Sequence, residues 1–289
     1  MLIPCKDIGL VLENYLSHHI RELIQKPKLI TFLLGSAPEQ LSFVEIKKRL
    51  ADRIGASFEL RHYPEDPPFT AFRNKISDTA QLPDTTGIII QHPLPAGFDP
   101  ASLYSVIPHQ KEIEGHIPGS SFHFPLSLAV LAGIKYVILK ELRNDYTPGE
   151  ESIVNFSGDR EPLSEYLSGK KIVIVGRGIT GGKPIGKILS DLNVPFTMIN
   201  SETKTPETYY KNADMIITAV GKKILKPSMI KKGVVLLNVG LRKENGKLKG
   251  DYDEEEIKDI ASYYTETPGG LGPLDVLYLY KNLYDASNL

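Results

Sequence analysis

Residues 171–182 read Lys-Ile-Val-Ile-Val-Gly-Arg-Gly-Ile-Thr-Gly-Gly. Residues 171–175, apolar after the first lysine, are typical of a buried parallel strand, and a helix is expected at residues 184–192. Between them, Gly176, Gly178 and Gly181 complete the pattern G-x-G-x-x-G. Such glycines let the backbone approach a pyrophosphate, and the helix N-terminus supplies free N–H groups. The stretch predicts a Rossmann-type loop for a nicotinamide dinucleotide, although a glycine-rich turn without a ligand has the same pattern.

The rest of the chain alternates between strand and helix, which predicts an α/β fold with parallel sheets. The expected strands lie at residues 29–34, 58–62, 86–91, 171–175, 195–199, 215–220 and 234–239. The expected helices lie at residues 7–26, 39–54, 67–84, 122–142, 184–192, 207–212 and 274–284. The glycine loop therefore opens the second of two α/β regions.

The length of the chain, 289 residues, fits two domains of roughly 150 residues each. Residues 143–166 are polar and rich in turn formers, so they predict a linker. We therefore expect a first α/β domain at residues 1–142 and the Rossmann-type domain at residues 167–273.

Composition and charge narrow the class of protein. The net charge is −1, from 34 basic and 35 acidic residues, which gives no electrostatic basis for binding nucleic acid or an anionic membrane. No apolar run approaches the roughly 18 residues of a membrane span, and the N-terminus lacks the features of a signal peptide. Cys5 is the only cysteine, so a disulfide within the chain is excluded and a reducing compartment is expected. We expect a cytoplasmic enzyme that acts on a small molecule, without a metal site.

The choice between NADP and NAD depends on residues beside the glycine loop. Arg177 could pair with a 2′-phosphate, and Ser201, just after the second strand of this region, also favours NADP. Glu202 favours NAD, because a carboxylate at this place holds the ribose diol. We predict NADP, with NAD as the alternative.

The glycine loop and three further motifs resemble one family, the bifunctional methylenetetrahydrofolate dehydrogenase/methenyltetrahydrofolate cyclohydrolases. Gly-Ile-Ile-Ile-Gln-His-Pro-Leu-Pro at residues 87–95 resembles their G-I-x-V-Q-x-P-L-P segment. Residues 175–184 resemble their cofactor loop V-G-R-S-x-x-V-G-x-P. Residues 267–273 resemble V-P-G-G-V-G-P, and residues 247–251 resemble K-L-x-G-D. The order and spacing of these motifs cover most of the chain.

The resemblance implies a fold and a reaction. It implies a folate-binding catalytic domain, a Rossmann-type domain, an active site in the cleft between them, and a last helix at residues 274–289 that joins the first domain. It also implies hydride transfer from methylenetetrahydrofolate to NADP, hydrolysis of the methenyl product to formyltetrahydrofolate, and a homodimer. A monofunctional dehydrogenase, a catalytically silent paralogue that binds folate or dinucleotide, and an unrelated dehydrogenase of shikimate type are the alternatives.

The resemblance also assigns residues. Lys47 and Gln91 match the catalytic lysine and the glutamine that orients it, and lysines in semi-enclosed sites transfer protons near neutral pH. Glu114 matches the acid that holds the amino-pyrimidinone edge of the pterin, and Phe43 matches the tyrosine that stacks on it. The remaining substrate-binding residues are Pro268, Gly269 and Gly270. The expected cofactor-binding residues are Gly176, Arg177, Gly178, Ile179, Gly181, Ser201 and Gly221.

Several positions depart from the family pattern. Phe43 lacks the tyrosine hydroxyl, and Glu114 is one methylene longer than the usual aspartate. Gly178 replaces a serine, and Asn238 replaces an aspartate. Residues 143–163 look like an insertion relative to the family pattern. Loss of the hydroxyl at Phe43 is expected to reduce cyclohydrolase activity more than dehydrogenase activity, because hydride transfer needs mainly positioning.

Overall fold

A computed structural model describes residues 1–289, which form two compact units. The three-stranded unit comprises Glu13–Pro125 and Val276–Leu289, and the five-stranded unit comprises Met1–Leu12 and Leu126–Asp275. Helices α1 (Cys5–Glu22) and α10 (Leu271–Ala286) contribute residues to both units. No helix in the structure combines the length and the apolar character needed to cross a membrane.

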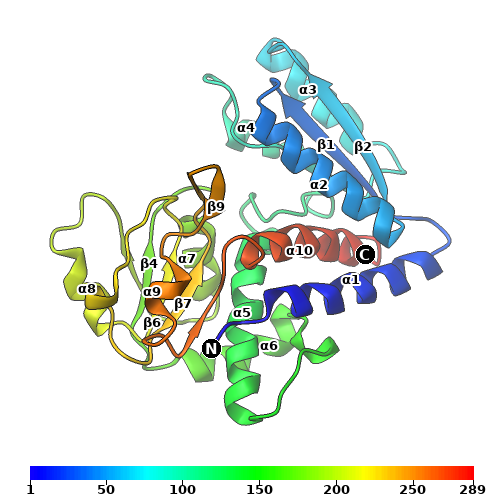
Figure 1. Cartoon of the computed structure of the whole chain (residues 1–289). Helices are drawn as coiled ribbons and strands as arrows, with labels where there is room; N and C mark the ends of the chain where they lie inside the picture. The colour runs from blue at the N-terminus through cyan, green and yellow to red at the C-terminus, as the bar shows by residue number, and fades with distance from the viewer. The chain divides into compact units, whose positions relative to one another are not determined.

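The three-stranded unit contains a parallel sheet in the order β2-β1-β3. Its strands are β1 (Lys28–Leu34), β2 (Ser57–Tyr63) and β3 (Gly87–Ile90). Alternate side chains of β1, such as Ile30 and Phe32, pack with Phe72 and Ile76 of helix α3 (Phe69–Ala80). Helix α2 (Pro38–Ile54) lies in front of the sheet in Figure 1, and α3 lies behind it. The unit is therefore a helix–sheet–helix sandwich.

Local sequence signals explain where the main helix of this unit begins and ends. Pro38 occupies the first turn of α2, where its missing N–H costs no hydrogen bond. Gly55 ends the helix with φ 82°, a left-handed conformation that glycine adopts freely. The short helix α4 (Pro100–Tyr104) was not expected from the sequence, and the side chain of Asp99 caps it by accepting the N–H of Ser102.

The five-stranded unit contains a parallel sheet in the order β10-β7-β6-β4-β5. Its strands are β4 (Ile172–Val175), β5 (Thr197–Ile199), β6 (Met215–Thr218), β7 (Val235–Asn238) and β10 (Tyr263–Tyr264). After β5 the chain returns across β4 to form β6, so the strand order reverses at β4. Ligands of such sheets bind at the carboxyl end of the strand where the order reverses. The glycine loop follows β4 directly.

Smaller elements complete this unit (Figure 1). Helices α7 (Gly182–Asp191), α8 (Pro206–Asn212) and α9 (Glu254–Ile257) connect the strands, with a 3-10 turn η2 (Pro227–Met229) before β7. Strands β8 (Arg242–Glu244) and β9 (Lys247–Lys249) form an antiparallel hairpin. The sequence signalled neither the hairpin nor β10, because their runs are short and polar or aromatic.

The division of the chain differs from the expected one near residue 142. Helix α5 (Pro125–Leu142) belongs to the five-stranded unit, because its apolar surface packs there. Gly133 lies so close to β7 that an added Cβ would touch Leu237 at 3.4 Å. Residues 143–166 are not a simple linker either. They contain the 3-10 turn η1 (Glu150–Ser152) and most of helix α6 (Phe156–Leu167), whose Leu163 and Leu167 are buried.

Candidate functional site

Lys47 and Gln91 meet in the three-stranded unit, although 44 residues separate them in sequence, and Lys47 Nζ donates to Gln91 Oε1 at 2.7 Å. Gln91 follows β3 and stays in register because its N–H donates to Phe32 O at 2.8 Å. The carbonyl of Lys47 accepts the hydroxyl of Tyr280 at 2.8 Å. Both partners are therefore held through their backbones as well as their side chains.

Phe43 lies one turn before Lys47 on α2, so the two side chains share a helix face. The ring is 46% exposed, whereas Val44 beside it is buried in the core. A core role for Phe43 is thus excluded. Its exposed face is free to stack on a flat ligand, as the resemblance implies.

The loop that carries Glu114 is held by a neighbouring acid. Glu112 is fully buried, and its two oxygens accept the N–H groups of Glu114, Gly115 and His116 at 3.0, 3.1 and 3.0 Å. Gly115 has φ 78°, and a Cβ there would lie 2.6 Å from Phe122 O. Glu112 and Gly115 therefore fix the backbone of this loop, which sets the direction of Glu114.

The carboxylate of Glu114 has an oxygen that is available to accept a hydrogen bond from a ligand. Its Oε2 atom is buried and has no hydrogen-bond partner. Burial raises the pKa of this carboxyl, but the nearby His116, Lys47 and His92 outweigh burial and leave the pKa below its usual value. An ionised carboxylate with a buried, unused oxygen is a strong acceptor for a donor pair such as N–H groups in one plane.

The glycine loop of the five-stranded unit is shaped by close backbone approach. Gly176 has φ 110°, and a Cβ there would lie 2.5 Å from Ala219 O. A Cβ on Gly182 would lie 1.9 Å from Gly176 O, whereas a Cβ on Gly178 would meet no atom within 4 Å. The tight positions fold the loop, and the open position beside the N-terminus of α7 leaves space for a ligand. These residues fit the pyrophosphate of a dinucleotide.

An exposed ion pair lies beside the glycine loop, and a buried acid supports the neighbouring loop at Gly221. Arg177 pairs with Glu202 at 2.9 Å, and both side chains are exposed. Ser201 lies in the same turn and is exposed. Gly221 has φ 73°, and its loop is held by the buried Asp251, which accepts the N–H groups of Val220 and Lys222 at 2.9 and 3.0 Å.

Asn238 holds the loop at residues 267–270 in place, although its family counterpart is an acid. Its amide nitrogen donates to Gly240 O and to Thr267 Oγ1, both at 2.8 Å. Its oxygen accepts the N–H of Asp251 at 2.8 Å. An amide supplies both the donors and the acceptor needed here, which a carboxylate cannot do.

The next loop residues are Pro268, Gly269 and Gly270, which belong to the five-stranded unit. Lys47 and Gln91 belong to the three-stranded unit. Gly269 has φ 96°, and a Cβ on Gly270 would lie 2.3 Å from Glu266 O. The loop therefore needs glycine at both positions. No group of three or more His, Cys, Asp or Glu side chains is arranged to hold a metal ion.

Sequence reasoning missed four residues that shape these sites. Glu112 and His116 stand two residues before and after Glu114, so the alternation Glu-x-Glu-x-His was the available signal. Gly182 doubles the last glycine of the loop motif, and Asp251 ends the segment at residues 247–251. Asp251 acts on residues 220 and 222, and Gly182 acts through the nearness of the Gly176 backbone, so neither could be assigned from the pattern alone. Glu112 and His116 act on neighbours within four residues, but the pattern does not show the turn that brings these groups together.

Two family profiles match this chain. The profile of the tetrahydrofolate dehydrogenase/cyclohydrolase catalytic domain matches residues 3–114, and that of the family's NAD(P)-binding domain matches residues 161–289. The chain is 34% identical to the bifunctional protein FolD of Bacillus licheniformis, over 97% of this chain and 95% of that protein. It is 32% identical to FolD of Lactobacillus gasseri, over 88% of this chain and 85% of that protein.

Solved structures share the fold. The bifunctional enzyme FolD of Campylobacter jejuni superposes with a TM-score of 0.84 at 24% identity, covering 100% of this chain and 98% of that one. The methylenetetrahydrofolate dehydrogenase of Bombyx mori gives a TM-score of 0.79 at 24% identity, covering 99% and 97%. The two family matches and the identity to the FolD proteins exclude an unrelated dehydrogenase. The chain belongs to the tetrahydrofolate dehydrogenase/cyclohydrolase family.

Proposed function

We propose that this protein oxidises methylenetetrahydrofolate to methenyltetrahydrofolate with NADP and then hydrolyses the product to formyltetrahydrofolate. The observation that carries the proposal is the 2.7 Å contact between Lys47 and Gln91, within a unit that also holds the ionised Glu114. The catalytic-domain match over residues 3–114 includes all three residues.

Substrate binding is assigned to Glu114 and Phe43. The free Oε2 of Glu114 and its second oxygen would accept two N–H groups from the amino-pyrimidinone edge of the pterin. The exposed ring of Phe43 would stack on the flat part of the folate. Pro268, Gly269 and Gly270 are proposed to supply further contacts through their tightly folded backbone.

Cofactor binding is assigned to the loop after β4. Backbone N–H groups at Gly178 and Ile179 would hold the pyrophosphate. The N–H groups of Gly176 and Gly181 donate to Ile199 O and Gly178 O, so these two glycines would serve by shaping the turn, with Gly221 in the neighbouring loop. Arg177 would turn from Glu202 to a 2′-phosphate, with Ser201 beside it. When bound, the cofactor supplies the nicotinamide carbon that accepts the hydride.

The hydrolytic step depends on Lys47. Water adds to the methenyl carbon, loses a proton, and one of the two carbon–nitrogen bonds then breaks as its nitrogen gains a proton. Lys47 Nζ would transfer these protons, and Gln91 Oε1 holds that nitrogen in one direction. Hydride transfer needs no such group, so the two activities are separable by mutation.

A direct assay tests the proposal. Purified protein receives methylenetetrahydrofolate with NADP or NAD, and reduced cofactor and methenyl absorbance are followed separately. We expect reduced cofactor to form faster with NADP, and added methenyltetrahydrofolate to disappear faster than in buffer. Silence with both cofactors would contradict the proposal and favour a paralogue that binds without catalysis.

A second candidate function, a monofunctional dehydrogenase, is favoured by one observation. Phe43 places no hydroxyl near Lys47, so a donor and acceptor that the family uses is missing from this face of α2. In the same assay, this candidate predicts reduced cofactor without enzymatic loss of methenyltetrahydrofolate.

The family resemblance supports two finer proposals, a homodimer and a cytoplasmic location. The unpaired, buried thiol of Cys5 suits a reducing compartment. Light scattering coupled to size exclusion should give twice the chain mass of 32.1 kDa, and a monomer would contradict the dimer. Fractionation of cells that carry a tagged chain tests the location.

A further inference from the structure

His116 lies against the carboxylate that is proposed to bind the folate. Its Nε2 atom is 3.6 Å from Glu114 Oε2, and each side chain is only 16% exposed. That distance is too long for a hydrogen bond, so the oxygen keeps its capacity to accept one from a ligand. A protonated imidazole at this distance still attracts the carboxylate strongly, because little water screens the pair.

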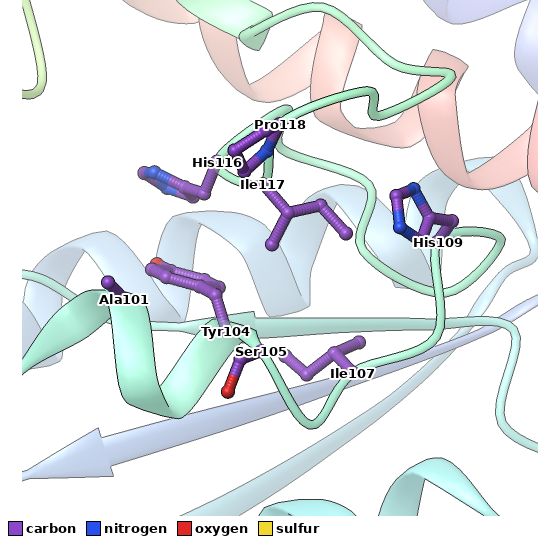
Figure 2. A pocket seen from close by; sticks show the side chains of 8 residues that line it. All are labelled: Ala101, Tyr104, Ser105, Ile107, His109, His116, Ile117 and Pro118. Atoms are coloured by element: carbon purple, nitrogen blue, oxygen red, sulfur yellow. The ribbon is translucent and has the colours of Figure 1, made fainter.

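Aromatic rings fix the imidazole in this position. The Tyr104 ring stacks on it with centroids 4.2 Å apart, and the Phe124 ring meets it edge-on at 5.1 Å. His116 and Tyr104 also line one end of a pocket of about 310 Å³, and His109 lies at the other end (Figure 2). The ring is therefore held rigidly, while the pocket gives it a route for exchanging protons with water.

The charges around the ring decide which histidine carries the proton. Burial lowers the pKa of His116, but the carboxylates of Glu114 and Glu112 outweigh burial and raise the pKa above its ordinary value. His92, whose ring centroid is 5.7 Å away, has a lowered pKa because of burial and the nearby cations His116 and Lys47. Of the two histidines, His116 therefore binds its proton more tightly.

Two further groups face the pair. Burial and the charge of Glu114 raise the pKa of Glu112, which is held by backbone N–H groups. Tyr104 stays neutral, because burial and both carboxylates raise its pKa well above the ordinary value. Neither supplies a positive charge to Glu114.

We propose that His116 is a positioning residue for folate binding: its imidazolium keeps the Glu114 carboxylate ionised and aimed, and thereby extends substrate binding to lower pH. The inference rests on the proposed function, since Glu114 is assigned to the folate there. It adds a residue that acts through Glu114 and touches neither the reacting carbon nor the cofactor.

The first test needs no folate. The ring protons of His116 are titrated by NMR, with the signal identified by its loss in His116→Gln. We expect the midpoint to lie above the ordinary value of 6.5 and to fall by about one pH unit or more in Glu114→Gln. If His116→Gln does not fold, the signal is identified by its loss in His116→Phe instead. Equal midpoints in wild type and Glu114→Gln would overturn the pairing.

The second test measures binding of tetrahydrofolate, kept free of oxygen, by calorimetry from pH 5 to 8; this probe has the amino-pyrimidinone edge and carries no one-carbon group that the protein could convert. In His116→Gln the loss of affinity on acidification should start about one unit higher, giving about tenfold weaker binding than wild type near pH 5 and similar binding at pH 8. His109→Gln is the matched control, since His109 is exposed and lines the same pocket.

The outcomes separate two failures. A wild-type protein that binds no folate and has no dehydrogenase activity contradicts the proposed function. A wild type that binds folate, with the same pH profile in His116→Gln, contradicts the positioning role alone. Uniform weakening at every pH would also overturn the role, because it would show that His116 contributes only to packing.

Discussion

The Glu114 loop and the glycine loop are shaped in opposite ways. The Glu114 loop is filled with side chains, and buried carboxylates and an imidazole orient one another there. The glycine loop is shaped by missing side chains, because a Cβ on Gly182 would lie 1.9 Å from a carbonyl oxygen. Charge changes should therefore dominate in the three-stranded unit, and added volume should dominate in the five-stranded unit.

The largest expected effect is on hydrolysis, at Lys47. Lys47→Ala removes the proposed proton-transfer group, so cyclohydrolase activity should fall by about 10²–10⁴-fold while dehydrogenase activity falls much less. Stopped assays of both activities measure this. Lys48→Ala, an exposed lysine next along α2, is the control and should change neither activity. Full cyclohydrolase activity in Lys47→Ala would remove this lysine from its role.

The next effect tests the shape of the glycine loop. In Gly182→Ala the new methyl group collides with the Gly176 carbonyl, so the loop must move. Overpacking of this kind costs about 1–3 kcal/mol of folding free energy, and the KM for NADP should rise sharply. Thermal unfolding and kinetics check both. Gly149→Ala, where a Cβ meets nothing within 4 Å, should change neither, and equal behaviour of the two variants would refute the shape argument.

A smaller effect concerns the choice of cofactor. Arg177→Ala should raise the KM for NADP by about tenfold, because one charged hydrogen bond to the 2′-phosphate is lost, and should leave the KM for NAD nearly unchanged. Glu202→Gln should act in the opposite direction, since it frees Arg177 from its 2.9 Å ion pair. Arg160→Ala, on an exposed part of α6, is the control. Equal changes in the KM for NADP and for NAD would show that Arg177 does not contact the 2′-phosphate.

Phe43→Tyr returns a hydroxyl to the face of α2 that carries Lys47. The ratio of cyclohydrolase to dehydrogenase activity should rise about fivefold, the value of one modest hydrogen bond. Both activities are measured on the same preparation. A ratio that stays constant would indicate that this protein hydrolyses its substrate without a hydroxyl at this position.

The smallest effect is on stability as a function of pH. Folding lowers the pKa of Glu114, so its contribution to stability is lost as pH falls below 4.5, the pKa of this group in the unfolded chain. Folding raises the pKa of His116, so its contribution is lost as pH rises above 6.5, the pKa of histidine in the unfolded chain. The difference in Tm between wild type and Glu114→Gln should therefore be largest between pH 4.5 and 6.5, by about 1–3 °C. A difference that is flat with pH would contradict the ion pair.

Much of the fold was predictable from the pattern of apolar residues and from the residues that end helices. Apolar runs located β1 and β3 of the three-stranded sheet, and the alternation of Phe58 and Leu60 with polar residues located β2. Gly55 marked the end of α2 because the chain there takes a left-handed conformation. The polar stretch at residues 143–166 misled, since α6 buries few residues and its Asn155 cap resembles a turn signal. Helix α5 was assigned to the other unit because its apolar surface does not reveal which sheet it covers.

The sequence by itself determined the α/β class, the glycine loop and the family, because these depend on residue types at short spacing. Tertiary structure alone decided which groups meet. Lys47 reaches Gln91 across 44 residues, and Asn238 holds Thr267 across 29. It also decided that His116 faces Glu114, although only one residue separates them, because the bonds from Glu112 set the turn between them. Hydrogen bonds and charge pairs depend on distance in space, which local patterns do not encode.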